Sequence, residues 1–220
     1  MLTIGQTAPQ PVLEQWIQGH EPEIQQLRGQ VILIEVIQVN CPGCFVHALP
    51  EAIRLHETYQ AEGLKVFAIA TAFEDFEHNT LNNLQRLLQH GQLQGAPLEQ
   101  LAQADFLEDG NLPYAIPFSV AMDRIEENTE PVNRQTIEQF IVSQIPDFFE
   151  NDWKPQRRHA IYQQAENYLM NKTHKALTFE LYELQGTPSS ILIDRNGHLH
   201  DIHCGIPGGL EDKVIQLLSR

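Results

Sequence analysis

Two of the three cysteines, Cys41 and Cys44, are separated by two residues. Thiols at this spacing either exchange electrons with a disulfide or provide half of a metal site. The stretch before them, Val31 to Val39, is almost continuously apolar and β-branched, which is typical of a strand buried on both faces. A helix is predicted from there to about Gln60, with a bend at Pro50. Cys41 would then lie at a helix N-terminus, where free N–H groups and the helix dipole favour the thiolate that attacks disulfides.

The second thiol, Cys44, lies one helical turn further on, where it can resolve a mixed disulfide formed at Cys41. A zinc site would need two more ligands, and the sequence contains no second Cys-x-x-Cys. The pattern therefore favours a redox pair over a metal site, and it implies neither an organic cofactor nor a metal ion.

The surrounding sequence predicts an α/β protein. Leu64 to Ala70 reads as a second strand, which completes a strand–helix–strand unit around the cysteines. Residues 1–30 are expected to form a loose segment with at most a short helix. The other predicted elements are a helix over 80–108 that breaks near Gly91 to Pro97, a strand at Pro117 to Asp123, a helix over 155–183, a hairpin of Ser190 to Ile193 with His198 to His203, and a helix after Gly208-Gly209.

Composition narrows the possible partners. The chain has 220 residues, with 14 Lys and Arg against 29 Asp and Glu. This acidic excess argues against nucleic acid and against anionic membranes as partners. Three cysteines are too few for a disulfide-stapled secreted scaffold, and the N-terminal residues lack a secretory signal. We therefore expect a cytoplasmic protein without a transmembrane helix.

The motifs also carry a family resemblance. Asn40-Cys41-Pro42-Gly43-Cys44 and Gly186-Thr187-Pro188-Ser189, the latter followed by a strand and an Asn-Gly turn, together resemble the thioredoxin-like superfamily. The similarity is greatest to its redoxin branch, which includes TlpA-type thiol-disulfide oxidoreductases. The resemblance covers about 1–125 and 178–220. It implies one thioredoxin-like domain over 1–220, a central mixed β-sheet flanked by helices, with a helical insertion at 126–177.

The resemblance implies roles for individual residues. Cys41 would be the attacking thiol and Cys44 the resolving thiol. Pro188, preceded by Thr187 in the substrate groove, would be the cis-proline that faces the pair and beside which an extended substrate docks. The partners would be protein or small-molecule disulfides, together with a dithiol protein as electron donor. Cys204 and Gly205 would lie in the loop that lines the same groove.

Three of the candidate residues have two interpretations each. Glu35, at the place of the buried acid in thioredoxins, would have a raised pKa and relay protons, or it faces a polar pocket or water. His47 stabilises a thiolate as a cation, or it is a solvated residue on the helix. Cys204 is an alternative resolving thiol, or a small buried apolar residue.

The sequence departs from the family pattern in two places. Asn40 replaces the aromatic residue usual before the first cysteine, and Pro50 falls one residue later than the helix-kinking proline of most TlpA-like proteins. Gln38 and Ile34 stand where the peroxidatic motif of peroxiredoxins has Thr or Ser and Pro. The absence of this motif argues against peroxidase activity.

Three alternatives to a thiol-disulfide oxidoreductase are considered. They are a peroxiredoxin-like thiol peroxidase, a non-catalytic redox sensor or binding module, and a protein that delivers a metal or metal cluster.

Overall fold

The computed structural model describes residues 2–205 and 208–220. The chain divides into two units, one formed by the residues up to Ile125 and from Ala176 onward, the other by Glu126–Lys175. Each unit has hydrophobic clusters made only of its own residues. A single domain over 1–220 with an insertion at 126–177 remains an interpretation of these two units.

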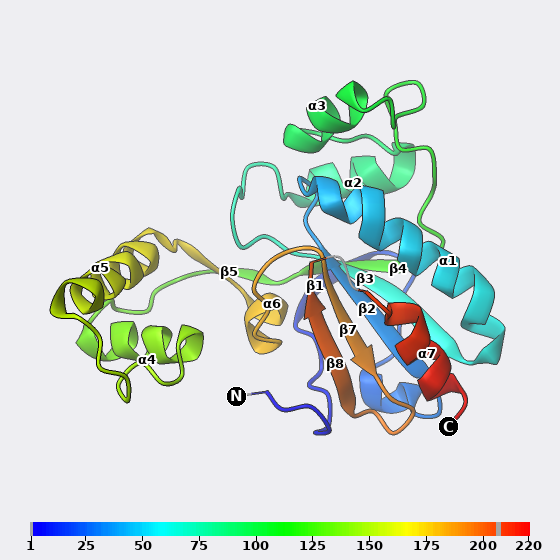
Figure 1. The fold of residues 1–220 in the computed structure, drawn as a ribbon. Coiled ribbons are helices and arrows are strands. Elements are labelled where there is room, and N and C mark those ends of the chain that lie inside the picture. Colours follow the sequence, from blue (N-terminus) through cyan, green and yellow to red (C-terminus); the bar gives the residue numbers. More distant parts are fainter. Residues whose placement is uncertain (1, 206–207) are drawn as a thin grey trace. The chain divides into compact units, whose positions relative to one another are not determined.

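The larger unit is built on a six-stranded sheet with the order β1-β4-β3-β2-β7-β8 (Figure 1). Strands β2, β3 and β4 are parallel, whereas β1, β7 and β8 each run antiparallel to their neighbours. The sheet is therefore mixed, as the sequence predicted. The strands are β1 (Leu13–Gln18), β2 (Val31–Ile37), β3 (Leu64–Ala70), β4 (Ser119–Asp123), β7 (Ser189–Ile193) and β8 (Leu199–Cys204).

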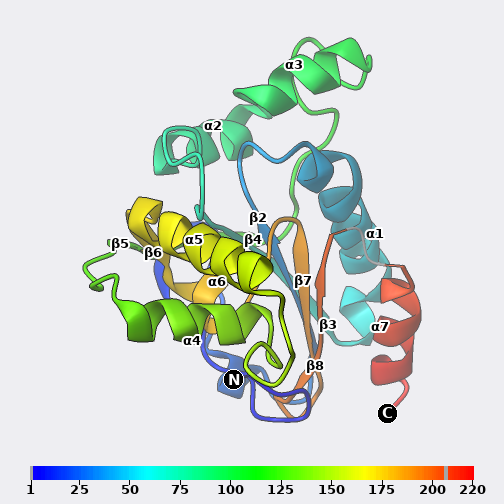
Figure 2. The same cartoon turned by 60° about the vertical axis from the view of Figure 1, so that its left-hand side comes forward.

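Helices cover both faces of this sheet (Figures 1 and 2). Successive side chains of β2 point to opposite faces and therefore pack in two separate cores. Val31, Leu33 and Ile37 pack in one core with apolar residues of α1 (Leu49–Tyr59), α2 (Leu81–His90), α3 (Ala96–Gln103) and α7 (Leu210–Leu218). The alternate residues Ile32, Ile34 and Val36 pack in a second core with η1 (Ile24–Leu27) and α6 (Leu177–Leu181). β2 is buried along its whole length because both of its faces are covered.

The helix that follows Cys41 is irregular near its start. Pro42 and Gly43 are already helical, and a π-helical turn, η2 (Cys44–Ala48), precedes α1. In this turn the Leu49 N–H donates to the carbonyl of Cys44, five residues back instead of four. A 3₁₀ turn, η3 (Gln60–Glu62), ends the helix at Gly63, whose φ of 100° requires glycine. The interruption predicted at Pro50 thus takes the form of a π-turn just before it.

Two predictions about elements were wrong. Residues 1–30 are not only a loose segment with a short helix, because β1 forms an edge strand paired with β4. Half-exposed edge strands carry a weak apolar alternation, and this one depends on a partner about a hundred residues away. The helix expected over 155–183 is interrupted by the short strand β6 (His174–Ala176).

The smaller unit contains two helices, α4 (Arg134–Gln144) and α5 (Pro155–Asn171), which pack together. A capping box of Asn133 and Thr136 begins α4. β5 (Ile125–Glu127) pairs with β6 and forms a two-stranded ribbon at the boundary of the units. Across residues 2–205 and 208–220, no helix is long and apolar enough to cross a membrane.

Candidate active site

Cys41 and Cys44 lie at the carboxyl end of the central strand β2, at the start of the following helix. Cys41 is partly exposed, whereas Cys44 is 0% exposed. The Cys44 N–H donates to the Cys41 Sγ at 3.3 Å, and also to the Cys41 carbonyl at 3.1 Å. Both cysteines are free thiols, not joined in a disulfide. The structure therefore places one accessible thiol next to one buried thiol.

The surroundings shift the pKa values of the two thiols in opposite directions. The pKa of Cys41 is lowered to about 7, chiefly by a hydrogen bond with Cys44 and further by Thr187 and the N–H groups of Cys44 and Gly43, although burial opposes this. The pKa of Cys44 is raised well above its usual value by burial and then by the neighbouring Cys41. Only the accessible thiol is thus substantially ionised near neutral pH.

The loop before β7 lies against the cysteine pair. The Thr187–Pro188 peptide bond is cis, and the Cys41 thiol donates to the Thr187 carbonyl at 3.5 Å. A Cβ on Gly43 would lie 3.6 Å from Pro188 Cδ, an ordinary van der Waals contact, so the start of the helix and the proline are direct neighbours. Two segments almost 150 residues apart in sequence are brought together here.

Glu35 lies on β2, on the sheet face that packs with Cys44 and α1, because Leu33 and Ile37 on either side of it belong to that core. It is 1% exposed, and its Oε1 accepts a hydrogen bond from the Ser190 hydroxyl at 2.7 Å. Its Oε2 is buried without a hydrogen-bond partner. Burial raises the pKa of Glu35 to about 8, against the lowering effect of Ser190. This burial and the raised pKa agree with the interpretation of Glu35 as a buried acid and not with a residue that faces water.

Cys204 and Gly205 also lie beside the loop that contains Pro188. Cys204 pairs with Ser189 between β8 and β7, and its Sγ is 3.4 Å from the position of a Cβ on Gly186. The Gly205 N–H donates to the Pro188 carbonyl at 2.7 Å. Cys204 is exposed, so its interpretation as a small buried apolar residue was wrong. His47 is exposed on the π-turn, so the structure agrees with a solvated residue on the helix.

The contacts of several polar side chains at the site were not predicted from the sequence. Buried Gln38 accepts from the Thr187 hydroxyl at 3.0 Å and donates to the Glu74 carbonyl at 3.2 Å, so it joins β2 to two loops. Asn40 receives a 2.8 Å hydrogen bond from Asn79. The one sequence feature that could have indicated these contacts is the polar residue Gln38 near the end of an otherwise apolar run. Asn79 follows β3 in a loop whose position the sequence does not specify.

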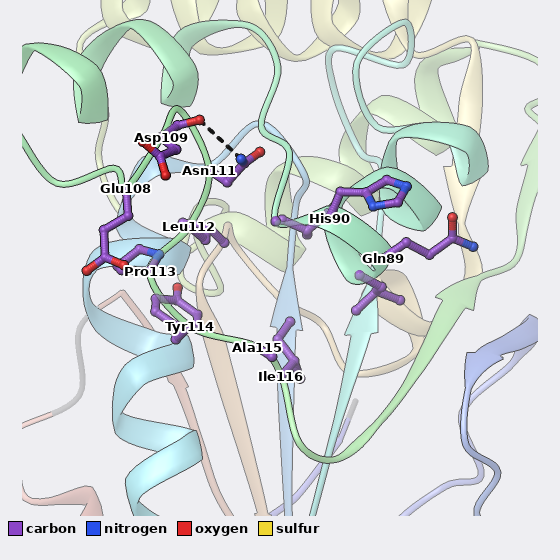
Figure 3. A pocket seen from close by; sticks show the side chains of 13 residues that line it. Gln89, His90, Glu108, Asp109, Asn111, Leu112, Pro113, Tyr114, Ala115 and Ile116 are labelled. Atoms are coloured by element: carbon purple, nitrogen blue, oxygen red, sulfur yellow. Dashed lines mark hydrogen bonds between the residues drawn. The ribbon is translucent and has the colours of Figure 1, made fainter.

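A pocket of about 500 Å³ lies between the end of α2 and the stretch Glu108–Ile116 (Figure 3). Neither cysteine lines it, but Tyr114 does. In the described parts of the chain, no group of three or more His, Cys, Asp or Glu side chains is arranged to hold a metal ion.

Comparison with solved structures shows the class of fold. A thioredoxin-like superfamily protein is 22% identical over 98% of each chain, with a TM-score of 0.59. A thiol-disulfide isomerase from Corynebacterium glutamicum is 21% identical over 97% of each chain, with a TM-score of 0.57. A protein assigned as the thiol:disulfide interchange protein DsbE of Chlorobium tepidum is 19% identical over 99% of each chain, with a TM-score of 0.50.

The chain therefore has the thioredoxin-like fold, as its sequence motifs suggested. No protein-family model and no curated protein matches its sequence. At this level of identity the likeness defines the fold, and the activity has to be argued from the site.

Proposed function

We propose that the protein is a thiol-disulfide oxidoreductase that uses Cys41 and Cys44 through a mixed-disulfide intermediate. The observation that carries this proposal is the pair itself: an accessible Cys41 thiol with a pKa of about 7 lies next to a fully buried Cys44 whose pKa is raised. A thiolate available near neutral pH is the attacking group in disulfide exchange. The protonated Cys44 thiol reacts only after the mixed disulfide at Cys41 has formed.

The proposed reaction has two exchange steps. The Cys41 thiolate attacks one sulfur of a substrate disulfide, so that a Cys41–substrate bond forms and the first substrate thiolate leaves and takes up a proton. Cys44 then loses its proton and attacks the Cys41 sulfur, which forms the Cys41–Cys44 disulfide and releases the second substrate thiolate. Two electrons pass from the protein dithiol to the substrate disulfide, and an external dithiol restores the pair.

Neighbouring groups are proposed to assist these steps. Burial raises the pKa of Glu35 to about 8, so only its ionised fraction, a minority near neutral pH, would accept the Cys44 proton and return it to solvent or to the leaving group. The segment from Thr187 to Pro188, which contacts Cys41, would hold an extended substrate beside the pair, with Cys204 and Gly205 at the edge of the same groove. No cofactor takes part. The small number of cysteines favours a reducing compartment, for which we propose the cytoplasm.

The test is reduction of insulin and of a small disulfide with a dithiol donor. We expect turnover by the wild type and loss of turnover in Cys41→Ser. Cys44→Ser should retain the first step and accumulate a mixed disulfide with its substrate, which a reductant releases. Activity that persists in Cys41→Ser would contradict the assignment of the nucleophile. A Cys41–Cys204 disulfide in Cys44→Ser would identify Cys204 as an alternative resolving thiol.

Each alternative function gives a different result in the same preparation. Peroxide consumption that depends on Cys41, without disulfide reduction, would favour a thiol peroxidase. A partner that is retained in only one redox state, without turnover of generic disulfides, would favour a redox sensor. Stoichiometric metal in the purified protein would favour metal delivery.

A further inference from the structure

Pro50 leaves one carbonyl of the cysteine-bearing helix without a helical donor. The Leu49 N–H is used by the Cys44 carbonyl, five residues back in the π-turn. At the same spacing the Phe45 carbonyl would receive its hydrogen bond from residue 50, and proline has no N–H. Phe45 is 0% exposed. A buried carbonyl without a partner is costly, so another donor is needed at this point.

Tyr114 supplies that donor from outside the helix. Its hydroxyl donates to the Phe45 carbonyl at 2.6 Å, across 69 residues of sequence. Figure 3 shows Tyr114 on the extended stretch that runs beside the helix toward β4. Its ring packs against the same core as Cys44, Phe45 and Leu49. Burial, and next the nearby Cys44, raise the pKa of Tyr114, so the phenol keeps its proton and remains a donor.

We propose that Tyr114 is a positioning residue for Cys44: by bonding the carbonyl that Pro50 leaves free, it holds the π-turn that begins at Cys44. This inference rests on the proposed function, because it concerns the second exchange step. In that step a Cys44–Cys41 bond forms, the Cys41–substrate bond breaks, and the released substrate thiolate takes up a proton. An anchored turn keeps Cys44 close to Cys41 and so raises its effective concentration there.

The first test is Tyr114→Phe, which removes one hydroxyl and keeps the ring. Loss of one hydrogen bond should make the Cys41–Cys44 disulfide about three- to tenfold easier to reduce at equilibrium with oxidised and reduced dithiothreitol. Resolution of a mixed disulfide at Cys41 should slow by a similar factor, whereas the first attack by Cys41 should keep its rate. An unchanged equilibrium and an unchanged resolution rate would overturn the proposal.

Tyr182→Phe is the matched control. Tyr182 is a buried tyrosine on the opposite face of the sheet, and its hydroxyl also donates to a backbone carbonyl, that of Pro9. This variant should lose stability to a comparable extent and leave the dithiol–disulfide equilibrium unchanged. If it shifts that equilibrium as much as Tyr114→Phe does, the effect is one of general stability and the proposal fails.

Pro50→Ala tests the mechanism. Alanine restores an N–H to the helix, which allows the Phe45 carbonyl to find a backbone donor. In this background Tyr114→Phe should change the equilibrium by less than about twofold. An equal effect in both backgrounds would show that Tyr114 does not act through the carbonyl. These outcomes are separate from failure of the proposed function, which would appear first as wild-type protein without Cys41-dependent turnover.

Discussion

Glu35 is an unusual residue for the centre of an apolar strand, because both of its neighbours on the same sheet face belong to the hydrophobic core. Only one of its oxygens has a hydrogen-bond partner, the Ser190 hydroxyl. A carboxyl group in this position is neutral at neutral pH and becomes charged only at a cost. Strongly shifted pKa values are common among groups that transfer protons at active sites, which supports the proposed relay to Cys44.

Glu35 should make the stability of the protein fall as pH rises. The unfolded chain loses this proton near pH 4.5, whereas the folded protein keeps it to about pH 8, so the folded state binds more protons across this window. We expect Glu35→Gln, which cannot ionise, to gain stability relative to the wild type by on the order of 3 kcal/mol between pH 5 and pH 8. Urea unfolding of the reduced proteins at several pH values measures this difference. A difference that is constant with pH would contradict the buried state of Glu35.

At the scale of elements, the π-turn reconciles the position of Pro50 with a continuous helix. A π-turn contains one residue more than an α-turn, and this one lies directly before Leu49 and Pro50. The extra residue is thus absorbed between Cys44 and Pro50. The cysteines keep their place at the helix start, and α1 keeps its apolar face on the sheet.

A second element-scale feature is the end of β4. Asp123 is 0% exposed, and it accepts hydrogen bonds from the Thr71 hydroxyl and from the N–H groups of Thr178 and Phe179. One carboxylate thereby joins β4 to the end of β3 and to the first turn of α6. This link positions α6 over the second core of the larger unit.

Substitution of Asp123 should therefore destabilise the larger unit. Asp123→Ala leaves three buried donors without an acceptor and should lower the free energy of unfolding by about 3 kcal/mol or more. Asp123→Asn keeps one acceptor oxygen and should lose less. Thermal or denaturant unfolding of the three proteins measures the order. Equal stability of wild type and Asp123→Ala would contradict a structural role for this carboxylate.

At the scale of the molecule, charge is distributed unevenly between the two units. Residues 126–175 carry eight acidic and six basic residues, which leaves 21 acidic and eight basic residues for the larger unit. Most of the excess negative charge therefore belongs to the unit that contains the cysteines. The acidic run over 126–152 is largely balanced within its own unit by Lys and Arg residues that follow it.

The two units should be separable. The Asn128 N–H donates to the Thr173 carbonyl at 2.8 Å, so the chain enters and leaves the smaller unit at adjacent positions. Because neither core uses residues of the other unit, replacing residues 129–172 by an Asn-Gly turn should leave a folded protein whose Cys41 keeps its reactivity toward small disulfides. Circular dichroism, thermal unfolding and thiol alkylation check this. Aggregation or loss of Cys41 reactivity would contradict it.

Local patterns in the sequence were sufficient for the active-site strand, the helix after it, the C-terminal hairpin and the cysteine pair, because the signals for each lie within a few residues of one another. The sequence did not reveal β1, since an edge strand with exposed side chains depends on pairing with β4. It also did not reveal that Gln38 joins two loops or that Tyr114 bonds to Phe45. Those contacts join segments far apart in the chain, and hydrogen-bond partners at such separations are decided only when packing of the core brings the segments together.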